Sequence, residues 1–393
     1  MVLGRFACAA PVHPLSDHRV ATGVEERGEG PATPPARSQL ARRAGVVSAA
    51  VALSRVLGVV REQAFAVFFG AGRELDAFIT AFRIPNLLRD LFAEGALSAA
   101  FVSTFTQQLE REGAASAWRL ASQVINALVL VVGTIVVLGV IWAPQLAGLI
   151  APGFEAIPGK LELTVHLARV MWPFLLMVSL AAVAMGILNA RHIFGVPALA
   201  AAFFNVGSIV GGLGCATWFA PHYMREIAAA VWNGTGAVPR DALEATRAIT
   251  GMAIGTLAGG ALQFLVQLPA VRGTGFRYQW GLDWRDPALR RVLRLMGPAT
   301  IGAAAVQVNV FVNNNFASYL GDGPVSWLNV AFRFMQLPIG LFGVAIGTVT
   351  LPEVSRQAAR GELDGLRRTL ANALTLLATL CIPAAMGLHV LRV

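Results

Sequence analysis

The chain of 393 residues is 56% hydrophobic and only 13% charged, and its mean hydropathy of +0.63 is far above that of a soluble protein of this length. Its formal net charge of +9 suits nucleic-acid binding at first sight, but the basic residues lie mainly between apolar runs, where they act as topology signals. The composition therefore excludes a soluble globular protein and a nucleic-acid partner, and it predicts an integral membrane protein.

The first forty residues differ from the rest of the chain. Residues 1–40 are rich in proline, glycine and charge and cannot bury a core. We therefore expect either a disordered cytoplasmic tail or a start codon that was assigned too far upstream. The three cysteines, Cys8, Cys215 and Cys381, are scattered without metal-ligand spacing, so no disulfide framework or metal site is predicted.

Apolar runs, read against the polar breaks between them, predict about nine membrane-spanning helices. Each run is long enough to cross a hydrocarbon layer, and a lipid-exposed segment of that length has to be helical. The expected helices cover residues 44–69, 76–105, 118–142, 162–190, 196–220, 247–271, 288–320, 325–353 and 366–390. Asp76 opens the second of them, where a carboxylate is expected to be the N-cap.

The connections between these helices differ in charge. One side carries fifteen basic residues: Arg42, Arg43, Arg111, Arg119, Arg191, Arg272, Arg277, Arg285, Arg290, Arg291, Arg294, Arg356, Arg360, Arg367 and Arg368. The other side carries five: Arg73, Lys160, Arg225, Arg240 and Arg247. The positive-inside rule therefore places the N-terminus in the cytoplasm.

The chain repeats itself weakly at an offset of 250 residues. The triplet AFR at 81–83 recurs at 331–333, LF at 91–92 recurs at 341–342, and LA at 120–121 recurs at 370–371. Three matches at one register favour a duplication. We therefore expect a first six-helix lobe over 41–275 and a second lobe over 276–393 that holds only helices seven to nine, with the C-terminal helices missing.

Ionised residues lie inside several of these predicted spans. Arg55, Arg61 and Glu62 fall in the first, Arg333 falls in the eighth, and the second carries Arg83, Arg89, Asp90 and Glu94. An arginine facing lipid at mid-bilayer costs at least ~2.5 kcal/mol, so the residues deep in their spans, Arg55, Arg61, Arg89 and Arg333, indicate a polar cavity. Structural pairing or snorkelling to the headgroups is the alternative, and for Arg83 the two readings weigh equally.

The surplus of positive charge predicts an anionic cargo, because a guanidinium fork binds phosphate or pyrophosphate in a bidentate manner. Pro85 and Pro338 lie close to the arginines and predict bent helices beside the cavity, as in transporters. An enzyme acting on a polyprenyl phosphate would need a carboxylate or histidine cluster, and His166, His192 and His222 are isolated. A transporter is therefore favoured over an enzyme.

One stretch resembles a known family. The sequence SRVLGVVREQAFAVFFGAGRELDAFITAFRIPNLLRDLFAEGALSAAFV at 54–102 is similar to the N-terminal signature of the MurJ (MviN) family, lipid II flippases of the multidrug/oligosaccharidyl-lipid/polysaccharide exporter superfamily. Supporting matches are APGF at 151–154, MGPA at 296–299, VSW at 325–327 and GVAIGTVTLP at 343–352.

The resemblance implies an all-α polytopic membrane protein with two pseudo-repeated helical lobes around a central cationic cavity. It places substrate-binding arginines at Arg55, Arg61, Arg89 and Arg333, with Asn86, Ser54 and Ser326 as polar neighbours. Asp76, Glu62 and Glu94 are the acidic positions with a gating or structural role. Two positions depart from the family, because Phe332 and Gln336 stand where some members carry an acidic residue.

The combined expectation is a monomeric, multi-pass protein of the bacterial inner membrane. It would move lipid II, an undecaprenyl-pyrophosphate-linked saccharide, from the inner to the outer leaflet by alternating access, with membrane lipid as its other partner. No cofactor is expected, and coupling to Na⁺, H⁺ or the membrane potential stays open. The alternatives are a drug/cation antiporter, which needs a carboxylate-dominated cavity, and an exporter of another polyprenyl-linked saccharide.

Overall fold

The computed structural model describes residues 34–90, 97–234, 241–338 and 342–390, and all regular secondary structure within these ranges is helical. This confirms the all-α prediction. The chain divides into two compact units, Met1–Ala44 and Gly45–Val393. Of the first unit only the opening turns of α1 are described, so residues 34–40 of the predicted tail are helical. The remainder of that tail lies outside the described residues.

The predicted first lobe contains α1 (Pro34–Phe69), α2 (Arg73–Arg89), α3 (Ser98–Arg111), α4 (Ala114–Ile141), α5 (Ala143–Ile150), the short 3₁₀ helix η2 (Pro152–Ala156), α6 (Lys160–Met171), α7 (Phe174–Ala190), α8 (Gly195–Phe219), α9 (Pro221–Trp232), α10 (Ala242–Leu265) and α11 (Leu268–Gly273). The predicted second lobe contains α12 (Pro287–Ser318), α13 (Pro324–Pro338), α14 (Val344–Ala359) and α15 (Leu363–Val390).

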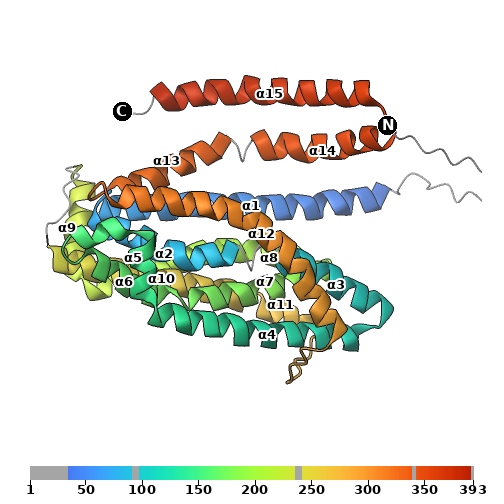
Figure 1. Cartoon of the computed structure of the whole chain (residues 1–393), viewed down its shortest axis with the longest axis horizontal. Helices are drawn as coiled ribbons and strands as arrows, with labels where there is room; N and C mark the ends of the chain where they lie inside the picture. Colours follow the sequence, from blue (N-terminus) through green and yellow to red (C-terminus); the bar gives the residue numbers. More distant parts are fainter. Residues whose placement is uncertain (1–33, 91–96, 235–240, 339–341, 391–393) are drawn as a thin grey trace, which may run out of the picture. The chain divides into compact units, whose positions relative to one another are not determined.

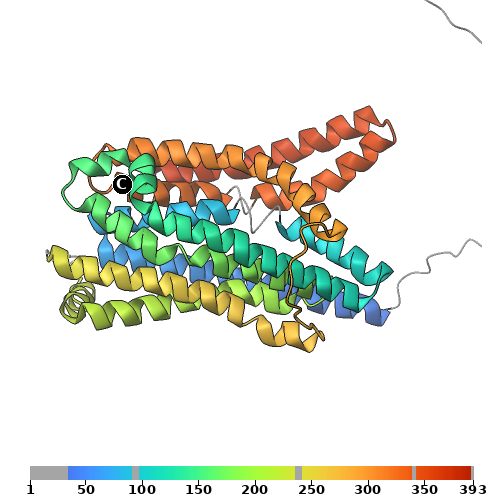
Figure 2. The same cartoon turned by 60° about the horizontal axis from the view of Figure 1, so that its bottom comes forward.

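Within the described residues, five helices are long and apolar enough to cross a membrane: Ala114–Ile141, Lys160–Ala190, Gly195–Phe219, Ala242–Gly273 and Leu363–Val390. Most of the long helices run along roughly the same direction in Figures 1 and 2, and the short α9 runs across it. α1 and α12 are also long, with 36 and 32 residues, and both carry several arginines, whereas α2 has 17 residues.

Two helices that we predicted as continuous include residues outside the described ranges. Of the expected helix over 76–105, the structure describes α2, up to Arg89, and α3, from Ser98. Of the expected helix over 325–353, it describes α13, up to Pro338, and α14, from Val344. The connection after α8 also contains a helix that we did not predict, α9.

The closest helix packing lies between α8 and α10, whose backbones touch through glycines. A Cβ atom added to Gly255 would lie 2.2 Å from the Cα of Gly212, and one added to Gly251 would lie 2.4 Å from the backbone nitrogen of Ala216. Small residues of this kind let membrane helices approach closely enough for dispersion contacts along the whole pair. The pair also contributes to the site described next, through Thr256 of α10 and Phe204 of α8.

Candidate functional site

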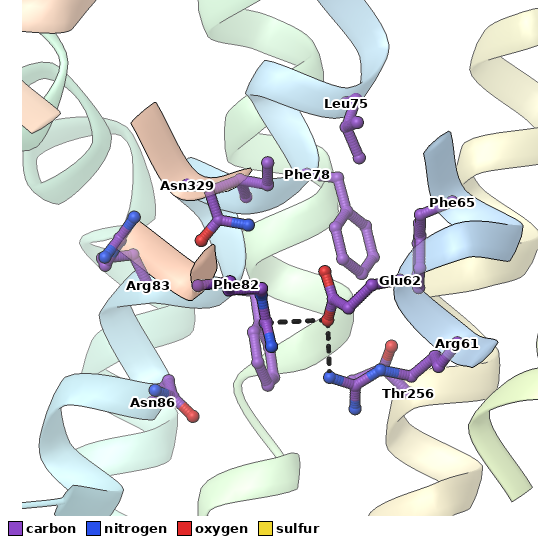
Figure 3. A pocket seen from close by; sticks show the side chains of 12 residues that line it. Arg61, Glu62, Phe65, Leu75, Phe78, Phe82, Arg83, Asn86, Thr256 and Asn329 are labelled. Carbon is purple, nitrogen blue, oxygen red and sulfur yellow. Dashed lines mark hydrogen bonds and ion pairs between the residues drawn. The ribbon is translucent and has the colours of Figure 1, made fainter. Parts of the chain in front are cut away.

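The candidate site is built around one carboxylate, that of Glu62. Arg61 and Glu62 are consecutive on α1, and the Nη2 atom of Arg61 lies 2.9 Å from Oε1 of Glu62. The same oxygen lies 2.7 Å from Nη2 of Arg333 on α13. Figure 3 shows the ion pair between Arg61 and Glu62 in the cavity. The guanidinium of Arg61 also lies over the Phe204 ring, 5.1 Å from its centroid. Glu62 therefore joins the predicted first lobe to the predicted second lobe through a shared ion pair.

These residues line a cavity of about 110 Å³, which has room for a few water molecules. Its walls are Arg61, Glu62, Phe65, Leu75, Phe78, Ile79, Phe82, Arg83, Asn86, Thr256, Asn329 and Arg333. Three arginines against one glutamate leave an excess of positive charge. Phe65, Phe78 and Phe82 make part of the wall apolar, which strengthens electrostatic contacts beside them. The cavity is therefore suited to an anion.

The structure brings part of the predicted set together. Arg61, Glu62, Asn86 and Arg333 line the cavity. Arg55 does not line it; its side chain is exposed on α1. The contact of Ser54 is made by its backbone, whose carbonyl accepts a hydrogen bond of 3.0 Å from Nδ2 of Asn205.

Arg89 is also outside the cavity wall. Its Nη2 atom lies 2.9 Å from Oδ1 of Asp90, the next residue. Oδ2 of Asp90 accepts a hydrogen bond of 3.2 Å from Nε2 of Gln307 on α12. This pair therefore forms a second polar link between the two predicted lobes. Glu94 lies outside the described residues.

Arg83, Asn329 and Thr256 line the cavity, although our predicted site omitted them. The internal repeat contained the missing signal, because Arg83 and Arg333 are the equivalent arginines of the two AFR triplets. Ile79 and Asn329 are also related by 250 residues, and both line the cavity. Equivalent positions of the two copies thus meet at one place.

Asp76 lies in a separate cluster of contacts between the two predicted lobes. Its side chain is fully buried, and its two oxygens accept from the backbone nitrogen of Gly323 at 2.7 Å, from the backbone nitrogen of Ser326 at 2.8 Å and from Oγ of Ser326 at 2.6 Å. These donors lie at the start of α13. The prediction that Asp76 caps its own helix is wrong: the N-cap of α2 is Gly72, and Asp76 caps α13 instead.

Lys160 completes this junction from the first residue of α6. Its side chain is fully buried, and Nζ lies 3.0 Å from Oδ2 of Asp76, 2.8 Å from Oδ1 of Asp322 and 3.1 Å from the carbonyl oxygen of Gly321. Nζ also lies 4.1 Å from the centroid of the Phe154 ring. A buried ammonium needs such partners, because desolvation would otherwise disfavour its charge.

The backbones around this junction are in close contact. The backbone nitrogen of Gly153 donates to Oγ of Ser318 at 3.1 Å, and a Cβ atom on Gly153 would lie 2.4 Å from the Ser318 carbonyl oxygen. A small apolar cluster seals the contact: Ala151, Phe154, Ala317 and Val325. We call this contact, from Asp76 and Lys160 to Ser318 and Ser326, the Asp76 junction.

Comparison with known proteins agrees with this arrangement. A family model described as lipid II flippase MurJ matches residues 65–392. The chain is 34% identical over 346 residues to a protein of Burkholderia cenocepacia named "Lipid II flippase MurJ", covering 87% of this chain and 62% of that protein. It is 34% identical over 355 residues to a "Probable lipid II flippase MurJ" of Vibrio cholerae, covering 88% of this chain and 62% of that protein.

A solved structure is also similar. It is titled "Lipid II flippase MurJ, inward closed conformation", and it matches with a TM-score of 0.66 and 27% identity over 87% of this chain and 64% of that chain. The chain thus spans about three fifths of the length of the curated relatives that it matches. Its apolar helices make it a multi-pass membrane protein. With the family model, the relatives and the fold in agreement, the chain belongs to the MurJ lipid II flippase family.

Proposed function

We propose that the protein containing this chain moves lipid II from the inner to the outer leaflet of the bacterial cytoplasmic membrane. The observation that carries the proposal is the cavity in which Arg61, Arg83 and Arg333 outnumber Glu62. A pyrophosphate crossing hydrocarbon has to be neutralised, and arginine forks do so with directed hydrogen bonds. The same excess of positive charge argues against a cationic cargo, since a drug/cation antiporter would need carboxylates.

The cavity has to expand during transport. A volume of about 110 Å³ holds a few waters and no lipid-linked disaccharide, so the present arrangement has the substrate space collapsed. In the proposed cycle the cargo's pyrophosphate replaces Glu62 as the partner of Arg333. The two lobes then separate on one side of the cavity and close on the other, which is alternating access.

The Asp76 junction is the proposed gate on the outer side. The positive-inside rule assigns the N-terminus and the arginine-rich connections to the cytoplasm, which places Asp76 and Lys160 towards the periplasm. Asp76 and Lys160 both belong to the first lobe, so their ion pair remains intact when the lobes separate. The contacts that open are those to Asp322, Gly323 and Ser326.

Rescue of a bacterium depleted of its own lipid II flippase tests this proposal. The full reading frame that contains this sequence should restore growth, whereas the same frame with Arg333→Ala should not. Arg356→Ala is the matched control, because Arg356 is an exposed arginine that pairs with Glu353 on α14. Membrane expression of every variant is measured by immunoblot. If the wild-type frame is expressed and does not restore growth, the cargo would be another polyprenyl-linked saccharide instead of lipid II.

A further inference from the structure

The helix α9 lies between two membrane-spanning segments and is itself too short to cross. It follows α8, which ends at Phe219, and precedes α10, which begins at Ala242. Its 12 residues extend only ~18 Å, whereas a hydrocarbon layer is ~30 Å thick. α9 also runs across the direction of the long helices (Figures 1 and 2). The chain therefore holds α9 beside the surface of the membrane.

One face of α9 is buried against the rest of the protein. It consists of Tyr223, Met224 and Ile227. The Tyr223 hydroxyl donates to the carbonyl oxygen of Phe68 at 2.8 Å, and the Tyr223 ring stacks against Phe69 with 6.1 Å between the ring centroids. The backbone nitrogen of Tyr223 donates to Oε2 of Glu244 at 2.8 Å. These contacts join α9 to the last turn of α1 and to the first turn of α10, so the rotation of α9 about its own axis is fixed.

The exposed side chains of α9 separate into an apolar side and a polar side. Ala228 lies three residues before Val231 and four before Trp232, so these three exposed residues share one side of the helix. His222 and Glu226 are also exposed and four residues apart, and they lie on another side. Trp232 is 91% exposed. A short helix with such a division is typical of helices that lie in the membrane interface.

Exposed tryptophans lie at the corresponding ends of neighbouring helices. Trp142 directly follows α4, Trp218 belongs to the last turn of α8, and Trp327 belongs to the first turn of α13. Tryptophan concentrates where hydrocarbon meets the headgroups, because its ring prefers an apolar environment and its N–H needs a polar partner. These helix ends lie opposite the arginine-rich connections, and the positive-inside rule assigns them to the outer side. Trp232 of α9 thus belongs to an aromatic belt.

We propose that α9 binds the outer leaflet of the membrane at the level of the headgroups. Ala228, Val231 and Trp232 face the acyl chains, and His222 and Glu226 face water. The occupant of the apolar side is the lipid surface, because tryptophans of α4, α8 and α13 are exposed at the same level and the bilayer contacts all of them. This role is separate from lipid II transport, since α9 contributes no residue to the arginine-lined cavity.

The depth of spin labels in the bilayer tests the proposal. The background has its cysteines replaced by alanine: Cys8, Cys215 and Cys381. Ala228→Cys and Glu226→Cys each carry one nitroxide, and the chain is placed in nanodiscs of phosphatidylglycerol and phosphatidylethanolamine. Collisions with oxygen and with a water-soluble nickel chelate give the depth of each label. The label at Ala228 should lie about 5–10 Å inside the headgroup boundary, and the label at Glu226 should lie at the boundary or in water.

Two tryptophan variants and one reference label complete the experiment. Leu130→Cys in α4 provides the reference for hydrocarbon, because Leu130 is exposed within a membrane span. Trp232→Glu places a charge on the apolar side of α9, so the label at Ala228 should move towards water. Trp280→Glu is the matched control, because Trp280 is equally exposed but lies in the connection between α11 and α12. Thermal unfolding in the same nanodiscs checks that each variant is folded.

Two results would overturn the proposal. Labels at Ala228 and Glu226 that are both in water would show that α9 stands clear of the bilayer. A label at Ala228 that neither oxygen nor nickel reaches would show that protein covers the apolar side, and in this preparation that protein is a second copy of the chain. Neither result depends on whether the protein flips lipid II.

Discussion

Asp76 and Ser326 are hydrogen-bonded to each other and stand 250 residues apart, the same separation that relates Arg83 to Arg333 in the cavity wall. Two copies related by a pseudo-twofold axis place equivalent positions opposite each other. The repeat therefore explains why Arg83 and Arg333 share the cavity wall and why Asp76 meets Ser326.

Loss of the Asp76 carboxylate should open the junction. In a background with Cys8, Cys215 and Cys381 replaced by alanine, Ala317→Cys reports exposure, because Ala317 is 6% exposed in the closed contact. Asp76→Asn removes the charge that caps α13, and labelling by a membrane-impermeant maleimide should rise about tenfold or more. Asp241→Asn, which removes the charge of an exposed N-cap on α10, is the control. Unchanged labelling in Asp76→Asn would contradict the capping role.

Replacing Lys160 should lower the free energy of unfolding more than replacing an exposed basic residue. Lys160→Met leaves the Asp76 carboxylate buried without its ammonium partner, which costs on the order of 3–5 kcal/mol. Thermal unfolding in detergent measures the effect, with the exposed Arg225→Met as the control on α9. A double variant, Lys160→Met with Asp76→Leu, should recover part of the loss. Equal stability of Lys160→Met and the control would argue against a buried ion pair.

Substitutions of Glu62 and of Arg333 should change the affinity for anions in opposite directions. Glu62→Gln removes the carboxylate that holds Arg333 at 2.7 Å, so inorganic pyrophosphate should bind more tightly. Arg333→Lys keeps the charge but loses the planar fork, so binding should weaken about tenfold. Isothermal titration of the purified chain measures both affinities. If pyrophosphate bound Glu62→Gln and wild-type protein equally, Glu62 would not compete for the site.

The glycine contact between α8 and α10 should tolerate no added methyl group. Gly255→Ala places a Cβ atom 2.2 Å from the Cα of Gly212, so the helices have to separate. Overpacking of this kind costs about 1–3 kcal/mol. Gly214→Ala on α8 is the matched control, because a Cβ atom there meets nothing within 4 Å. A lower midpoint of thermal unfolding for Gly255→Ala alone is the expected result.

Apolar run length was sufficient to predict most of the helices, because hydrocarbon leaves the backbone few alternatives. It did not predict α5 and α9, because both are too short to cross a membrane. Charge in apolar surroundings indicated Arg61, Glu62 and Arg333. The same signal also indicated Arg55, because Arg55 and Arg61 stand on one helix. Only the structure shows that the Arg61 end of this helix meets α13 through Glu62.

The role of Asp76 was missed for a similar reason. A carboxylate in the first turn of a helix has a local explanation as a cap, and the three matching segments of the repeat include neither Asp76 nor Ser326. Lys160 was placed in a connection for its charge alone. Only the folded chain shows it fully buried between two aspartates.

The bridging carboxylate of Glu62 also determines how much negative charge a group needs in order to bind in the cavity. One side-chain anion already binds Arg61 and Arg333, so an incoming group with a single negative charge merely exchanges one such partner for another. A pyrophosphate carries additional charge and additional oxygens, and it therefore gains where a phosphodiester does not. The cavity would thus reject the ordinary phospholipids that surround it in vast excess, and it would do so without recognising any sugar.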